Sequence, residues 1–462
     1  MSSENAAAVA KTDHEFATQS TTRLVIKYGG LTLIGMLAQA IMVILEGIII
    51  GNGLGVDGLA CVGLVMPLEN LQIAIGTGFG IGLSTVAAIK MGSGDKEGAR
   101  KVFATGTFFI ALFMFVVGLC LIAFAPAIAR LLGTPDEYMH YMVPFIRVFG
   151  VGYPFCGYGQ TVVFFFRMDE RPSLSTAAMT ITAILGVVYL YINCFVANFG
   201  IVGTGWYYAF SIGGWSFFGI YFFFSKKTAF RYHRKDIRLD WKVNLEAIKI
   251  ALPYFCVQAS TSVFTIIINN IIGVVGTDLH IAAYAIISGY VVYILNMFTT
   301  SISTGTTPII SYNLGEKMFQ RLRSLMTSSV LANLLSVGVV CIAFELLARQ
   351  ICVLFCGGDA ALVEVTVPAV RIAIACAWLG SCISIMSSYF EAVTKLIAAV
   401  FTGIGRYLIL SSLVMLVMVF ILKMGITGVW AALPVADGLA FVVTVLLMVR
   451  ESKRLKKLSS VG

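Results

Sequence analysis

The sequence predicts an all-α polytopic membrane protein with twelve transmembrane helices in two pseudo-symmetric six-helix bundles. Three observations lead to this fold class: an apolar composition, a series of long apolar runs and an internal repeat. Of the 462 residues, 59% are hydrophobic and 12% are charged, and the mean hydropathy is +0.92. Charged residues make up about a quarter of an average soluble domain, so this chain is too apolar to be one.

The apolar runs each extend over roughly 20 residues or more, the length that an α-helix needs to cross a bilayer. Membrane-spanning strands would show only about 9 to 11 residues of alternating character, so we expect helices. The twelve predicted spans are, approximately, residues 28–51, 59–89, 102–125, 139–166, 173–197, 202–224, 244–273, 280–311, 324–346, 364–391, 395–422 and 426–449.

A duplication relates the two halves of the chain. The pairs at a shift of 221 positions include Gly55 with Gly276, Asp57 with Asp278, Ile81 with Ile302, Thr85 with Thr306, Gly94 with Gly315, Lys96 with Lys317 and Arg100 with Arg321. A shift of 224 pairs Val143, Pro144 and Arg147 with Val367, Pro368 and Arg371, and a shift of 225 pairs Gly200, Ile201 and Gly203 with Gly425, Ile426 and Gly428. Because the shift changes so little, we interpret the chain as a repeat of six helices.

Six is an even number, so both halves enter the membrane in the same sense, as in transporters built from parallel repeats. The longest polar interruption separates them. We therefore predict five segments: a cytoplasmic N-terminal tail 1–27, an N-terminal lobe 28–224, a basic cytoplasmic linker 225–243, a C-terminal lobe 244–449 and a basic cytoplasmic tail 450–462. Two such lobes, with a cleft between them, suit transport by alternating access.

The net charge of +9 follows the predicted topology. Most of the 32 Lys and Arg residues fall in the tails, at odd helix ends or in the loops from even to odd helices; the exceptions are Arg130, Arg147, Arg349, Arg371, Arg406 and Lys423. By the positive-inside rule, both termini are cytoplasmic in a multi-pass protein of the inner (plasma) membrane. The basic charge therefore indicates contact with membrane lipid, and no nucleic acid is expected. The polar leader lacks the order of a cleavable signal, so the first helix should remain as a span.

Two carboxylates stand inside the first two predicted helices. Glu46 follows some twenty apolar residues, and Glu69 comes two residues after Pro67 in the return helix. An ionisable group at such a depth is costly, so its default interpretation is functional. Glu46 is our first candidate for a coupling residue; its alternative is a structural carboxylate that is hydrogen-bonded to Gln39 or to backbone. For Glu69 the functional and structural interpretations have equal weight.

The second half offers neutral polar groups and one buried charge pair. Gln258, Asn269 and Asn270 lie in the seventh predicted helix, which also carries Ser260, Thr261, Ser262 and Thr265. A polar stripe of this kind can face a substrate or bond across helices. Asp437 in the last helix needs a partner or a function, and Arg406 in the eleventh helix is the candidate partner. An architectural ion pair and a role in binding substrate or ion remain equal alternatives.

No sequence pattern indicates a metal, a cofactor or an enzyme. The ten cysteines show no ligand spacing; Cys352 and Cys356 could form a disulfide, but buried free thiols are the better interpretation. The four histidines are dispersed, and no clustered nucleophile and base emerge. A Walker A sequence is missing, which excludes an ATP-driven pump for this chain alone.

Several motifs together resemble the multidrug and toxic compound extrusion (MATE) family of cation-coupled efflux transporters. They are EGIIIGNGLG (46–55), MPLENL (66–71), RMDERP (167–172), PIISYNLGEK (308–317) and GITGVWAALPVAD (425–437). The resemblance covers nearly the whole chain and implies export of small organic cations or drugs, driven by H⁺ or Na⁺ as the coupling cation.

The resemblance also carries roles to particular residues. Members of the family usually have an aspartate where this chain has Glu46, so the carboxylate is kept. Part of the family forms an ion site with an Asn and an Asp in the fifth helix; those places fall here near Gly186 and Leu190, with only Asn193 nearby. We therefore expect Glu46, Glu69, Gln39 and Asn193 to handle the coupling ion, and we favour protons over sodium.

Two other function classes stay open from the sequence. A lipid-linked oligosaccharide or other lipid flippase of the same superfamily would line its cleft with several arginines, and few embedded cations are present. An intramembrane enzyme is less favoured. Our prediction is a monomeric cation-coupled antiporter, without a cofactor, in which Gln258, Asn269, Asn270, Asp437 and Arg406 contact the substrate. At the shift of 221, Glu46 aligns with Ile267 and Glu69 with Tyr290, so the first half alone carries these acids.

Overall fold

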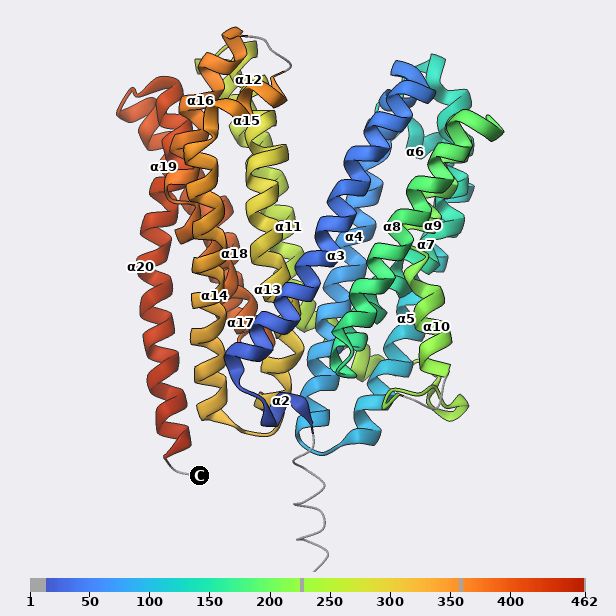
Figure 1. Cartoon of the computed structure of the whole chain (residues 1–462), viewed down its shortest axis with the longest axis vertical. Coiled ribbons are helices and arrows are strands. Elements are labelled where there is room, and N and C mark those ends of the chain that lie inside the picture. Colours follow the sequence, from blue (N-terminus) through green and yellow to red (C-terminus); the bar gives the residue numbers. More distant parts are fainter. Residues whose placement is uncertain (1–13, 225–227, 357–359, 461–462) are drawn as a thin grey trace, which may run out of the picture. The chain divides into compact units, whose positions relative to one another are not determined.

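The structure is a computed structural model that describes residues 14–224, 228–356 and 360–460. The predicted tails 1–27 and 450–462 and the predicted linker 225–243 therefore lie partly outside the described residues. Within the described part of the chain, every regular element is a helix and none is a strand (Figure 1). The predicted all-α class is confirmed.

Residue contacts divide the chain into two units. The N-terminal unit is the described part of Leu31–Ala251, and the C-terminal unit joins the residues up to Gly30 to those from Leu252 onward. Two long helices belong to both units: α3 (Thr21–Gly53) and α11 (Trp241–Val275). The lobes 28–224 and 244–449 were drawn from the sequence repeat, not from contacts, and they stay a prediction.

The N-terminal unit contains the larger part of α3 and a series of helices that follow it. They are α4 (Gly55–Gly92), α5 (Lys96–Ala123), α6 (Ala125–Leu131), the short 3₁₀-helix η1 (Asp136–Tyr138), α7 (Met139–Met168), α8 (Pro172–Ile192), the π-helical turn η2 (Asn193–Ala197), α9 (Gly200–Ser211), α10 (Trp215–Phe224), the 3₁₀-helix η3 (Arg234–Asp236) and the start of α11. The turn between α3 and α4 uses Gly55 with φ of +67°, a conformation that a residue with a side chain rarely adopts.

The C-terminal unit begins with the short helix α2 (Glu15–Thr18) and the first turns of α3. Its other elements are the rest of α11, α12 (Asp278–Ile286), η4 (Ile287–Val292), α13 (Tyr293–Gly315), α14 (Phe319–Leu346), α15 (Ala348–Phe355), α16 (Ala360–Ala375), α17 (Ala377–Ala392), α18 (Leu396–Ile404), η5 (Gly405–Leu410), α19 (Ser411–Leu416), η6 (Val417–Ile421) and α20 (Gly425–Ser459). Here η4, η5 and η6 are π-helical turns inside longer helices.

All twelve predicted spans fall on helical segments of the described chain. Among the described residues, nine helices are long and apolar enough to cross a membrane, and α16 with α17 makes a tenth if this pair, bent by 47°, counts as one span. The other two predicted spans coincide with α7, which contains Pro144 and Pro154, and with α9 and α10, which a break at 212–214 separates. The predicted spans are thus present as helices, some of which are bent or interrupted.

One helix is central in each unit. In the N-terminal unit α7 packs against α4, α5 and α9, and in the C-terminal unit α17 packs against α13, α14, α18 and α20. Small residues bring these helices close together: Gly118 on α5 and Gly150 on α7 lie back to back, and a Cβ atom on either would contact the other's backbone oxygen. Close approach of this kind is how helices associate when lipid tails offer no hydrophobic driving force.

The repeat is visible in how each unit holds a polar segment at one end. In the N-terminal unit the Nε atom of Arg100 contacts the Oδ2 atom of Asp236 at 2.9 Å, which fixes the linker. In the C-terminal unit Arg321, the repeat partner of Arg100, donates to the backbone oxygens of Phe16 at 2.8 Å and Gln19 at 2.7 Å. Equivalent arginines therefore anchor the segment that precedes the first helix of each half.

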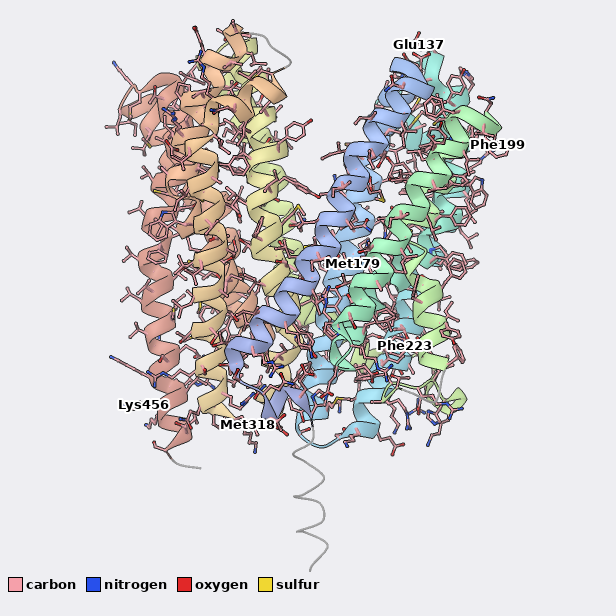
Figure 2. All side chains as sticks on the ribbon, in the orientation of Figure 1. Glu137, Met179, Phe199, Phe223, Met318 and Lys456 are labelled. Carbon is pink, nitrogen blue, oxygen red and sulfur yellow. The ribbon has the colours of Figure 1, made fainter. Side chains whose placement is uncertain are left out.

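Labelled side chains in Figure 2 mark both ends of the N-terminal unit and one end of the C-terminal unit. Glu137 and Phe199 lie at one end of the N-terminal unit and Phe223 toward the other. In the C-terminal unit Met318 and Lys456 share one end. Large apolar side chains stay exposed along the helices between these ends, as on Ile44, Leu335 and Val442, which suits a surface that faces lipid.

Candidate functional site

The N-terminal unit holds a buried acid. Glu46 on α3 is 7% exposed, and both of its oxygens accept hydrogen bonds from tyrosines of α9. The Tyr207 hydroxyl donates to Oε2 at 3.0 Å, and the Tyr208 hydroxyl donates to Oε1. In the part of the chain that the structure describes, no Lys or Arg forms an ion pair with Glu46. The carboxylate is therefore held by neutral donors alone.

Aromatic packing fixes these two donors. Tyr207 and Tyr208 are successive residues of α9. The centres of their rings are 5.1 Å apart, and the ring planes make an angle of 68°. Tyr208 also packs edge-on against Phe145 and Phe149 of α7, at 6.0 and 5.8 Å. A tyrosine buried in this way needs a partner for its hydroxyl, and Glu46 satisfies both.

Glu69 lies close to this acid. It stands on α4, two residues after Pro67, and it is near enough to Glu46 for the two charges to repel each other. The neighbouring backbone is tied to α7, because the Tyr153 hydroxyl donates to the Leu68 oxygen at 2.8 Å. The structure therefore brings together the two carboxylates that the sequence singled out. We call Glu46, Glu69, Tyr207 and Tyr208 the acid site.

One further polar residue near the acid site was missed by the sequence analysis. Gln72 follows Glu69 by one helical turn, is fully buried, and has no hydrogen-bond partner for either side-chain atom among the described residues. Residues three apart share a helix face, so Gln72 and Glu69 point the same way. A buried amide normally has a partner, and a water molecule or an ion is the usual explanation when the protein supplies none.

Gln39 and Asn193 bond elsewhere. The Gln39 side chain donates to the Met179 oxygen at 2.8 Å, and Asn193 in η2 donates to the Gly200 oxygen at 3.2 Å. Neither forms a hydrogen bond with Glu46 in the described structure. Both contacts brace helices of the N-terminal unit, and the predicted role of these two residues in ion coupling stays a prediction.

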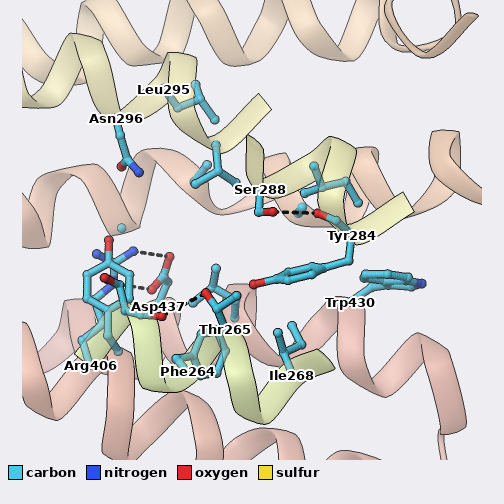
Figure 3. A pocket seen from close by; sticks show the side chains of 18 of the residues that line it. Phe264, Thr265, Ile268, Tyr284, Ser288, Leu295, Asn296, Arg406, Trp430 and Asp437 are labelled. Carbon is cyan, nitrogen blue, oxygen red and sulfur yellow. Dashed lines mark hydrogen bonds and ion pairs between the residues drawn. The ribbon is translucent and has the colours of Figure 1, made fainter. Parts of the chain in front are cut away.

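The C-terminal unit contains a cavity of about 260 Å³. Its wall is formed by α11, α12, η4, α13, α16, α17, η5 and α20 (Figure 3). Phe264, Tyr284, Trp430 and Leu433 supply apolar and aromatic surface. Polar and charged side chains from α11, η4, α13, α17, η5 and α20 complete the wall, and apolar surface with such polar groups is typical of small-molecule sites.

The predicted pair of Arg406 and Asp437 lines this cavity. The two side chains form a bidentate ion pair, with Nε–Oδ1 at 2.6 Å and Nη2–Oδ2 at 3.0 Å. The Nη1 atom of Arg406 donates to the Ser384 hydroxyl at 3.1 Å, and the guanidinium lies 4.2 Å from the centre of the Tyr407 ring. Arg406 is 6% exposed and Asp437 is 2% exposed, so the two charges neutralise each other in a buried place.

The other predicted substrate residues lie outside this cavity. Gln258, Asn269 and Asn270 are exposed on α11, and none of the three lines the cavity in the described structure. Asn270 donates to the backbone oxygen of Ile266 at 2.8 Å. Thr261 and Thr265, from the predicted polar stripe, do line it. Contact of Gln258, Asn269 and Asn270 with the substrate stays a prediction.

Among the described residues, no group of three or more His, Cys, Asp or Glu side chains is arranged to hold a metal ion. Cys352 and Cys356 are both buried and both free. The acid site contains two carboxylates and hydroxyls, which can bind a proton or a small cation, and the cavity contains a neutral ion pair and aromatic rings.

Comparison with known proteins gives consistent results. The MatE family model matches residues 31–192 and 253–417, one segment in each half. The multidrug export protein MepA of Staphylococcus aureus (strain N315) is 24% identical over 433 residues, which cover 90% of this chain and 91% of that protein.

Two solved structures share the fold. A crystal structure of MATE in complex with MaD3S superposes with a TM-score of 0.88 at 21% identity and covers 95% of this chain and 98% of that one. An outward-facing multidrug resistance MATE transporter of the MOP superfamily gives a TM-score of 0.86 at 22% identity, over 95% of this chain and 97% of that one. Such transporters have twelve helices in two bundles, so the predicted fold class is confirmed.

Proposed function

The chain belongs to the multidrug and toxic compound extrusion (MATE) family of membrane transporters, and we propose that it exports amphipathic and cationic organic compounds in exchange for protons, with sodium ions as the alternative coupling cation. As a member of this family the protein is a multi-pass transporter and not an enzyme. Support for the export of drugs comes from the relative in Staphylococcus aureus, which is named a multidrug export protein.

The buried Glu46 carboxylate is the observation that carries this proposal. An acid at this depth, with no cationic partner among the described residues, must either be neutralised by a proton or bind a cation. The two tyrosine hydroxyls can stabilise the charged form when the ion leaves. Glu46 can therefore load and release a coupling ion, whereas a permanently paired carboxylate could not.

Glu69 gives the acid site a second negative charge. A cationic drug is attracted by the same carboxylates that bind the coupling ion, so drug and ion compete for one charge. Competition of this kind is a simple mechanism of exchange: the ion binds as the drug leaves. Alternating access of the two lobes would then present the acid site to each side of the membrane in turn.

A lipid-linked oligosaccharide flippase is not favoured. Such a protein would hold a pyrophosphate with several unneutralised arginines. Arg406, the one arginine among the described residues that line the cavity, is already neutralised by Asp437 at 2.6 and 3.0 Å.

Proteoliposome transport tests the proposal. Wild-type protein should export a fluorescent cation when a proton gradient is imposed, and the Glu46→Gln variant, which keeps the shape and an acceptor oxygen, should lose this coupled transport. The matched control is Glu97→Gln on α5, whose side chain is 58% exposed, and which should transport as the wild type does. Coupled transport that survives in Glu46→Gln would contradict the assignment. Imposing sodium and proton gradients separately identifies the ion.

We also propose that the protein is a monomer in the plasma membrane, surrounded by lipid, with both termini in the cytoplasm. The basis for the orientation of the termini is the concentration of basic residues in the tails and in the linker. A reporter fused after Gly462 that fluoresces only in the cytoplasm should be active, and a periplasmic or extracellular reporter at the same place should be silent.

A further inference from the structure

We propose that the cavity of the C-terminal unit binds a small aromatic zwitterion, a compound with one ammonium group, one carboxylate and an aromatic ring. The cavity lies wholly within one unit and shares no residue with the acid site. The inference rests on the proposed function only in taking the bound compound to be transported. Binding itself can be measured without transport.

The size and wall of the cavity set the first limit. Ligand pockets for drug-sized compounds measure about 300–1,000 Å³, and this one has about 260 Å³. It therefore suits a single ring with a short polar chain. Phe264, Tyr284 and Trp430 line one part of the wall and offer faces and edges for an aromatic ligand (Figure 3).

The charge of the cavity sets the second limit. Arg406 and Asp437 lie side by side and add to zero net charge. A ligand with a single charge would meet attraction from one member and repulsion from the other at nearly the same distance. A ligand with two opposite charges can place each beside its complement and gains from both.

The ion pair keeps bonding capacity for such a ligand. A guanidinium carries five N–H donors, and the contacts with Asp437 and Ser384 use three. A carboxylate offers about four lone-pair positions, and Arg406 occupies two of them. Spare donors and spare acceptors therefore adjoin each other in a buried place, which is what a carboxylate and an ammonium on one ligand require.

Asn296 adds an adaptable polar group. It lies on α13, lines the cavity, and is directed toward the ion pair in Figure 3. Its amide has no hydrogen-bond partner within the described chain. An amide both donates and accepts, so Asn296 can contact either charged group of the ligand.

The backbone around the cavity is irregular where the polar groups stand. Two π-helical turns contribute to the wall: η4 supplies Ser288 and Val292, and η5 supplies Arg406 and Tyr407. Turns of this kind are frequent at functional sites. Gly380 opens the space beside the pair, because a Cβ atom there would collide with both Arg406 and Asp437.

Three matched probes test the inference on the full-length protein in lipid nanodiscs: phenylalanine, phenethylamine and 3-phenylpropionate. They share one ring and are zwitterionic, cationic and anionic respectively. Titration calorimetry should show phenylalanine binding with a Kd at least about tenfold lower than either other probe, a difference of roughly 1.4 kcal/mol. Equal binding of the three, tighter binding of a singly charged probe, or no binding would overturn the inference.

Two variants locate the binding. Ala377→Phe places a ring in the cavity while both charges of the ion pair are kept, and it should abolish binding of phenylalanine; binding that persists places the probe elsewhere and overturns the inference. The double variant Arg406→Gln with Asp437→Asn removes both charges without leaving one unpaired. It should bring the three Kd values to within about threefold of each other, and a retained preference for phenylalanine would contradict the role of the pair.

The two proposals fail in different ways. Glu46→Gln should bind phenylalanine as the wild type does, because it leaves the cavity intact. Coupled export of a cationic dye together with no phenylalanine binding would overturn this inference alone. Phenylalanine binding that Ala377→Phe abolishes, in a protein that exports no cation, would support the cavity and overturn the proposed function.

Discussion

Two buried acids, Glu46 in the N-terminal unit and Asp437 in the C-terminal unit, differ in what neutralises them. Asp437 is held at 2.6 and 3.0 Å by the guanidinium of Arg406, whereas Glu46 accepts only from the hydroxyls of Tyr207 and Tyr208. Both side chains are deeply buried: Asp437 is 2% exposed and Glu46 is 7% exposed. The comparison teaches that one helical repeat can carry a neutral ion pair in one half and an acid held only by neutral donors in the other.

The largest expected effect comes from breaking the pair. Asp437→Asn leaves Arg406 buried without a counter-charge and should lower the free energy of unfolding by about 3–5 kcal/mol. Glu46→Gln strands no charge and should cost within about 1 kcal/mol. Thermal unfolding in one detergent compares the two variants. The double variant Arg406→Gln with Asp437→Asn should recover most of the loss, and similar losses in both single variants would remove the proposed difference between the sites.

The tyrosines of the acid site should give the next effect. Tyr207→Phe removes one donor to Glu46 and should cost about 1.5–3 kcal/mol if that carboxylate is charged. In a Glu46→Gln background the same change should cost less, because the bond is then between neutral groups. A double-mutant cycle measures the difference. Equal costs in both backgrounds would show that the hydroxyl supports packing and not the acid.

Gly380→Ala should disturb the cavity by crowding the ion pair that lines it. Its new Cβ atom would collide with the Arg406 and Asp437 side chains, so the pair must shift, at a cost of about 1–3 kcal/mol. Gly338→Ala on α14 is the matched control, since no described atom lies within 4 Å of its added Cβ; it should be neutral or stabilise by up to about 1 kcal/mol. Chemical denaturation monitored by fluorescence compares the stability of the two variants. Equal stability would show that the cavity wall adapts to the added methyl group.

The smallest effect is expected at two equivalent positions of the repeat, Asp95 and Glu316, which lie outside both sites. Asp95 caps α5, where its Oδ1 accepts from the Gly98 N–H at 2.7 Å, and this hydrogen bond is the main reason that the pKa of Asp95 is lowered. Its repeat partner Glu316 caps no helix and accepts from the Tyr312 hydroxyl. Asp95→Ala should cost about 1 kcal/mol near pH 7 and Glu316→Ala less.

The pH dependence of this cap follows from the sign of its pKa shift. The pKa of Asp95 is lower in the folded than in the unfolded state, so its contribution is complete at neutral pH and is lost as the pH falls through the folded value. The stability difference between wild type and Asp95→Ala should therefore shrink between about pH 5 and pH 3. A constant difference across that range would show that the cap does not depend on the charge.

The sequence predicted some of these features and missed others. The spans, the repeat and the two acids of the first half followed from residue type and spacing, because a membrane leaves few options for long apolar runs and buried charge. The partners of Glu46 did not, since nothing in the run GTGWYY distinguishes a tyrosine that donates to an acid from one that packs. Gln39 was predicted beside Glu46 as a possible hydrogen-bond partner, and Asn193 because it lies near the place where part of the family has an Asn and an Asp; the side chains of both bond to other groups.

By itself, the sequence determined the fold class, the 6 + 6 duplication and the presence of Glu46, Glu69, Arg406 and Asp437 inside helices. Only the tertiary structure decided which charges are paired: Arg406 and Asp437 meet across η5 and α20, and Tyr207 and Tyr208 of α9 reach Glu46 of α3. The physical reason is that insertion into the bilayer depends on each helix alone, whereas the neutralisation of a buried charge depends on side chains from helices far apart in the sequence.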